Sequence, residues 1–139
     1  MTNFYKMNPE VKALWVADLK ANPLRQGRGC LRKGDAFCCL GRLTELYRQS
    51  KANTKQLDWG QRGPSGDYNF QGEGGILPKV VAEWADFKDL YGTNIVPTPF
   101  NEHMVQRNYV LANGEVHLPH LNDSGYSFEA IADIIEKHF

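Results

Sequence analysis

The sequence has no long hydrophobic run, few cysteines and no excess of charge of either sign. No apolar stretch approaches the roughly 18 residues that a membrane-spanning helix needs, so we expect no insertion into a membrane. The first seven residues mix polar and charged side chains, unlike the apolar core of a secretion signal. Three cysteines make a poor disulfide framework and indicate reduced thiols. We therefore expect a soluble, cytoplasmic protein.

The balance of charge excludes a second set of functions. The chain carries 16 basic and 16 acidic side chains, so no overall field draws it toward nucleic acid or an anionic membrane. We expect no nucleic-acid partner, and any electrostatic function must come from a local cluster of charges. A chain of 139 residues is typical of one domain, and we expect residues 1–139 to form a single globular unit.

Hydrophobic periodicity predicts about four helices. They are expected over about 9–21, over about 36–49, from Pro78, and after Ser127. Asn8 and Ser127 are typical helix N-caps, and Asp35 could cap the second helix. One side of that second helix is polar and is expected to face solvent; it carries Arg42, Glu45, Arg48 and Gln49.

The strand signals are shorter. The segment 109–118 is centred on Asn113-Gly114, a pair that is typical of a type I′ hairpin turn. The segment 29–33 could be a short strand, and 121–126 is expected to be a turn. Together these signals predict an α+β fold, in which about four helices pack with a small antiparallel hairpin or sheet.

The most informative segment is 25–35, a glycine-rich stretch that leads into a predicted helix. It contains four cations: Arg25, Arg28, Arg32 and Lys33. Gly27 and Gly29 would let backbone N–H groups approach a ligand closely, and arginine binds phosphate through paired hydrogen bonds. The pattern predicts a site for an anionic small molecule such as a nucleotide. A solvated turn between two helices is the alternative.

Residues 50–75 form a long glycine-rich and aromatic loop, or else an irregular pair of strands around 67–71. Trp59 and Tyr68 could stack on a nucleobase if this segment folds over the basic one. Aromatic side chains could equally hold a long loop against the core. We therefore predict Arg25, Arg28, Arg32, Lys33, Trp59 and Tyr68 as the ligand-binding residues.

Cys38 and Cys39 lie near the start of the second predicted helix, where a thiol can become nucleophilic, with His117 as a base. Buried packing of these cysteines is the simpler interpretation. The chain has neither the cysteine and histidine spacing typical of structural zinc nor a nucleophile elbow. We therefore expect no metal and no cofactor, and we favour a protein that is not an enzyme.

Two motifs carry a resemblance to a known family. They are FCCLG at 37–41 and the LND-G-SF--IAD-IE pattern at 121–136. With the segments 26–29 and 77–84 in the same order, they resemble small phage- and prophage-encoded proteins of unknown function, from about residue 8 to the C-terminus. The resemblance implies a protein made in the bacterial host cytoplasm during infection, and it brings no catalytic residues.

Three functions are open at this point. The first is a phage-type accessory protein, for host takeover or counter-defence, that sequesters an anionic small molecule without turnover. The second is an inhibitor or adaptor that docks on a host protein through residues 50–75. The third is a thiol hydrolase that uses Cys38 or Cys39 with His117. Each is compatible with self-association into a homo-oligomer.

Overall fold

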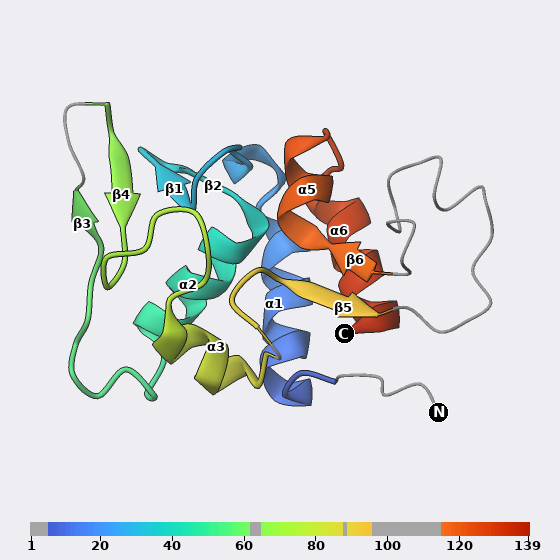
Figure 1. Cartoon of the computed structure of the whole chain (residues 1–139), viewed down its shortest axis with the longest axis horizontal. Helices are drawn as coiled ribbons and strands as arrows, with labels where there is room; N and C mark the ends of the chain where they lie inside the picture. The colour runs from blue at the N-terminus through green and yellow to red at the C-terminus, as the bar shows by residue number, and fades with distance from the viewer. Residues whose placement is uncertain (1–5, 62–64, 88, 96–114) are drawn as a thin grey trace.

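The computed structural model describes residues 6–61, 65–87, 89–95 and 115–139. It has the predicted α+β fold, in which the helices lie beside a small four-stranded antiparallel sheet (Figure 1). The helices are α1 (Pro9–Ala21), α2 (Cys39–Gln49), α3 (Lys79–Ala85), α5 (Leu118–Asp123) and α6 (Phe128–His138), with a 3-10 turn η1 (Pro23–Arg25). Within the described ranges, every helix is too short or too polar to cross a bilayer.

The main sheet joins two segments that are distant in the sequence. Its strands are β1 (Arg32–Lys33), β2 (Ala36–Phe37), β3 (Gly60–Gln61) and β4 (Asp67–Asn69), in the order β2-β1-β4-β3. All neighbours are antiparallel, and Arg32 pairs with Tyr68. The sheet therefore brings the basic segment beside the aromatic one. A separate antiparallel pair is formed by β5 (Thr93–Ile95) and β6 (Glu115–His117).

The core lies around α1, which packs against α6 and α2 (Figure 1). Trp15 is fully buried there, and its indole N–H donates to the Cys39 carbonyl oxygen at 2.9 Å. The two ends of the described chain meet, because the Met7 N–H donates to the Phe139 carbonyl at 3.0 Å. Burial of Trp15 and of the aliphatic side chains around it is the main source of stability.

The predicted first and last helices are confirmed, and their caps are as expected. The Asn8 side chain accepts from the N–H groups of Glu10 and Val11, and the Ser127 hydroxyl accepts from the Ala130 N–H. The second helix begins three residues later than predicted. Residues 36–37 pair with β1 as a strand, so the cap is the Cys38 side chain and not Asp35.

The predicted turn at 121–126 is wrong over its first half. Residues 118–123 form α5, because Pro119 stands in the first turn, where a missing N–H costs nothing. The His117 side chain caps this helix through the His120 N–H. The predicted hairpin turn at Asn113-Gly114 lies outside the described residues, and the partner of β6 is β5.

The polar side of α2, predicted to face solvent, does so only in part: Gln49 is exposed and Arg48 is half-buried. Arg42 and Glu45 are buried, with relative exposures of 9% and 8%. Asp18 of α1 and Trp59 cover them and also bond to them. Polar groups that are buried need hydrogen-bond partners inside the protein, and Arg42 and Glu45 have them.

Candidate functional site

The amides of the two glycines in the predicted anion-binding loop, Gly27 and Gly29, are already bonded within the protein. The Gly27 N–H donates to the Phe37 carbonyl at 2.6 Å, and the Gly29 N–H donates to Asp123 Oδ1 at 3.0 Å. The loop thus holds a carboxylate of its own chain where we expected a ligand. Gly27 is needed for close packing, because a Cβ there would lie 2.9 Å from the Ala36 Cβ.

Gln26 and the buried Asn122 tie this loop to the C-terminal motif. Gln26 Nε2 donates to Asn122 Oδ1 at 3.0 Å and to the Tyr126 carbonyl at 2.7 Å. Its Oε1 accepts from the Phe128 N–H at 3.1 Å, and Asn122 Nδ2 donates to the Gly27 carbonyl at 2.8 Å. The residues at 26–29 and 121–128 therefore contact one another and hold the fold together.

The arginines gather in an open polar cavity of about 310 Å³, which we call the arginine cavity. It lies where η1 and the β1–β2 hairpin face the polar side of α2. Four arginines and two carboxylates line it: Arg25, Arg32, Arg42, Arg48, Asp35 and Glu45. Asn22, Phe37 and Gln49 complete the lining. Two further carboxylates border these arginines from outside the lining, Asp18 beside Arg42 and Asp58 beside Arg48, so the cationic character of the cavity depends on how each arginine is paired.

Two of the four arginines have full carboxylate partners. Arg42 donates from Nε and Nη2 to the two oxygens of Asp18, at 2.8 and 2.7 Å. Arg48 donates in the same way to both oxygens of Glu45, at 2.7 Å each. Each of these pairs is bidentate, which fixes the plane of the guanidinium group. Arg42 and Arg48 therefore form a part of the cavity lining in which the side chains are held in place.

The other two arginines share a single, loosely placed carboxylate. Arg25 Nη1 and Arg32 Nη2 each lie 4.0 Å from the same atom, Asp35 Oδ1. The Asp35 side chain is 87% exposed, and charge-assisted hydrogen bonds are normally 2.7–2.9 Å long. Arg25 and Arg32 therefore keep most of their capacity to bind a further anion.

Aromatic rings hold the Arg32 guanidinium in place. It lies over the Tyr68 ring at 4.2 Å from its centroid, and 5.1 and 5.6 Å from those of Phe37 and Trp59. Its Nε donates to the Gly34 carbonyl at 2.8 Å. A side chain held in this way loses little conformational entropy on binding a ligand. The Arg32 side chain, 20% exposed, is oriented before any ligand arrives.

The structure brings some of the predicted site residues together and separates others. Arg25 and Arg32 line the cavity, and Trp59 and Tyr68 contact Arg32 from outside the lining. Lys33 follows Arg32 in β1 and is exposed beside Gly66, because successive side chains of a strand point to opposite faces. Arg28 is exposed next to Gly125.

A family model for a domain of unknown function, DUF8296, matches residues 7–139. The chain belongs to the DUF8296 family. No curated protein and no solved structure matches it. The matched span of this DUF8296 domain includes the whole arginine cavity and both motifs that carry the resemblance. The predicted membership of an uncharacterised family is confirmed at this level.

Sequence reasoning missed the α2 half of the DUF8296 cavity. Arg42, Glu45 and Arg48 recur every three residues, a pattern that is also typical of a solvated helix side. The available signal was Asp18, which shares one face of the first helix with the buried Val11 and Trp15. A charged residue on an apolar face requires a buried partner, and here that partner is Arg42.

Glu45 accepts hydrogen bonds from three neighbouring side chains. Its oxygens accept from Arg48, from Gln49 Nε2 at 2.7 Å and from Trp59 Nε1 at 2.9 Å. Burial alone would raise the pKa of Glu45, but these hydrogen bonds outweigh burial and lower it to about 2. The carboxylate is therefore ionised at any ordinary pH.

This low pKa predicts a loss of stability in acid. The folded-state value of about 2 lies below the ordinary value of 4.5, so the stabilisation is present above pH 4.5 and is lost as the pH falls toward 2. Between pH 7 and pH 3, we expect the free energy of unfolding of Glu45→Gln to fall by about 2 kcal/mol less than that of the wild type. Urea unfolding at pH 7, 4 and 3 measures it, with exposed Glu83→Gln as the control. Equal pH slopes in the wild type and Glu45→Gln would contradict it.

The cysteines of the DUF8296 domain sit in surroundings that suit packing. Burial raises the pKa of Cys38 to about 12 and raises the pKa of Cys39 as well. The Cys38 sulfur accepts from the Gly41 N–H at 3.4 Å, and His117 is used as the cap of α5. A protonated, buried thiol is a weak nucleophile. Across the described ranges, no cluster of metal-binding side chains is present.

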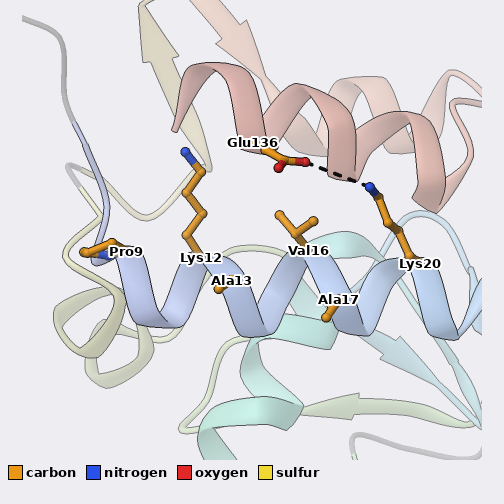
Figure 2. A pocket seen from close by; sticks show the side chains of 7 residues that line it. All are labelled: Pro9, Lys12, Ala13, Val16, Ala17, Lys20 and Glu136. Carbon is orange, nitrogen blue, oxygen red and sulfur yellow. Dashed lines mark ion pairs between the residues drawn. The ribbon is translucent and has the colours of Figure 1, made fainter.

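A second cavity, of about 530 Å³, lies along α1 and is bordered by Glu136 of α6 (Figure 2). Figure 2 shows Lys12 and Lys20 rising from α1 on either side of Val16, with Lys20 directed at Glu136. The Lys20 Nζ lies 3.9 Å from the Glu136 carboxylate. Pro9, Ala13, Val16 and Ala17 of α1 supply its apolar lining. This surface has mixed charge and lacks the convergence of cations seen in the arginine cavity.

Proposed function

We propose that this DUF8296 domain is a non-enzymatic binding protein that sequesters an anionic small molecule, such as a nucleotide, in the arginine cavity. The observation that carries the proposal is the pair Arg25 and Arg32, for which the exposed Asp35, at 4.0 Å from each, is the shared counter-charge among the residues that the structure describes. Two guanidinium groups that converge on one carboxylate also converge on the oxygens of a bound anion.

The size and the surroundings of the cavity support a small ligand. About 310 Å³ is at the lower end of the range for ligand pockets, which suits a mononucleotide better than a dinucleotide. Asn22 and Gln49 donate their side-chain N–H groups inward, to Asp18 and Glu45. An amide side chain in the lining also carries an oxygen acceptor, which is the group that an amino group of a base would need.

Turnover is not part of the proposal. The thiols that could act as nucleophiles are buried and have raised pKa values. Binding without reaction is a function that a small accessory protein can perform by removing a host metabolite or signal from solution. The resemblance to phage and prophage proteins motivates this role in the bacterial cytoplasm, as a host-takeover or counter-defence protein.

The test is calorimetric titration of the full chain with AMP, GMP, CMP and UMP. We expect at least one nucleotide to bind, and we expect Arg32→Ala and Arg25→Ala each to weaken it by about tenfold or more. Lys79→Ala, which removes an exposed cation from α3, is the charge control and should change affinity less than twofold.

Arg28→Ala separates the cavity from the loop predicted from the sequence. If the ligand sits in the cavity, Arg28→Ala binds as the wild type does. If Arg28→Ala loses binding while Arg25→Ala does not, the ligand sits at the loop and the cavity assignment is wrong. The proposal that the protein sequesters a nucleotide would be refuted if none of the four nucleotides bound and a native mass spectrum of freshly purified protein showed no bound small molecule.

A further inference from the structure

We propose that the ligand of the arginine cavity presents a phosphoryl dianion, and that this group displaces the Asp35 carboxylate from between Arg25 and Arg32. The inference rests on the proposed function and adds to it the charge class of the ligand and the residue that competes with it. Asp35 is then a specificity-determining residue, because it sets the least charge that a successful ligand must carry.

The geometry around Asp35 shows that its carboxylate is held only weakly by Arg25 and Arg32. One oxygen, Oδ1, faces both Arg25 and Arg32 at 4.0 Å, which is beyond hydrogen-bond distance. Asp35 stands in the two-residue turn between β1 and β2, next to Gly34, whose φ is 58°. With 87% of its side chain exposed, Asp35 can rotate into water without loss of the Lys33–Ala36 strand pair.

A phosphoryl group has what Asp35 lacks. It carries nearly two negative charges at neutral pH and three acceptor oxygens, so each guanidinium can use two N–H groups on it. A monocarboxylate ligand has the same charge as Asp35 and gains little by replacing a carboxylate already tethered at that point. Displacement therefore favours a dianion over a monoanion.

The rest of the cavity adds to this preference without competing for the ligand. Arg42 and Arg48 already have bidentate partners, and both residues line the same space. The Glu45 carboxylate, the second acid in the lining, receives hydrogen bonds from Arg48, Gln49 and Trp59. Asp35 is thus the acid of the lining that a ligand can displace at small cost.

The experiment is an amide chemical-shift titration of the full-length protein with inorganic phosphate at pH 7.5, where phosphate is mainly a dianion. Wild type, Asp35→Asn and Asp58→Asn are compared. Asp58 is the matched control, because it is an exposed acid 3.8 Å from Arg48 but does not stand between Arg25 and Arg32. We expect Asp35→Asn to bind phosphate on the order of fivefold more tightly than the wild type.

The outcomes are distinct. A change below twofold in Asp58→Asn, together with no shifts from acetate in the wild type, supports displacement. Equal gains in Asp35→Asn and Asp58→Asn mean a general field effect and overturn it, as does equal binding of acetate and phosphate. Unchanged or weaker binding in Asp35→Asn also overturns it, and so does the absence of phosphate binding in every variant. The nucleotide titrations with Arg32→Ala decide the proposed function independently of these results.

Discussion

The Gly41→Ala substitution is expected to lower the melting temperature by more than about 10 °C, which corresponds to at least about 3 kcal/mol. Gly41 lies in the first turn of α2, where the helix meets the backbone before β1. An added Cβ would overlap the Leu31 carbonyl oxygen and come within 2.7 Å of the Leu31 carbonyl carbon. Backbone atoms cannot rotate away as a side chain can, so the helix or the strand must move.

The cost is high because Leu31 is fixed from several directions. Its carbonyl accepts from the Cys38 N–H at 3.1 Å, its N–H donates to the Gly74 carbonyl at 2.6 Å, and its side chain is fully buried. Thermal unfolding followed by circular dichroism measures the effect. Gly75→Ala is the control, since a Cβ there meets nothing within 4 Å. Similar melting temperatures for the two variants would contradict this account of Gly41.

Loss of either partner of the Asp18–Arg42 pair is expected to cost about 3–5 kcal/mol. The two side chains are each 11% exposed and are joined by two hydrogen bonds. Removing Asp18 leaves the largely buried Arg42 guanidinium without the carboxylate that binds two of its N–H groups, and removing Arg42 leaves the Asp18 carboxylate without its charged partner. Denaturant unfolding of Asp18→Ala and Arg42→Met measures each loss.

A double-mutant cycle shows how much of that loss belongs to the pair. We expect Asp18→Ala combined with Arg42→Met to be more stable than the sum of the single effects predicts, because no unpaired charge remains. Additive effects would mean that the two residues act independently. The exposed pair Lys79–Glu83, at 4.0 Å, is the comparison and should contribute less than about 1 kcal/mol.

Local signals predicted the elements whose ends carry their own caps. Asn8-Pro9 begins α1 and Ser127 begins α6, since each cap bonds to amides only two or three residues away. The boundary of α2 was harder to predict because it depends on the pairing of Ala36 with Lys33. A strand of two residues has no periodicity of its own, so its presence is decided by its partners.

The candidate site, too, could be predicted from the sequence only in part. The sequence indicated that arginines and aromatic residues concentrate in two segments, and both contribute to the observed cluster around Arg32. It could not indicate that Arg28 and Arg32 separate, because this depends on the sheet that β1 joins. Nor could it show that Arg42 and Arg48 turn their charges into the same space.

By itself, the sequence determined the α+β class, the capped helices and the residue types that can hold an anion. Those properties follow from short-range hydrogen bonds, hydrophobic periodicity and the chemistry of single side chains. Only the tertiary structure decided which arginines converge and which carboxylates neutralise them, because those distances depend on how α1, α2 and the sheet pack. Long-range packing places Arg25 and Arg32 on either side of one exposed carboxylate while Arg42 and Arg48 receive full partners.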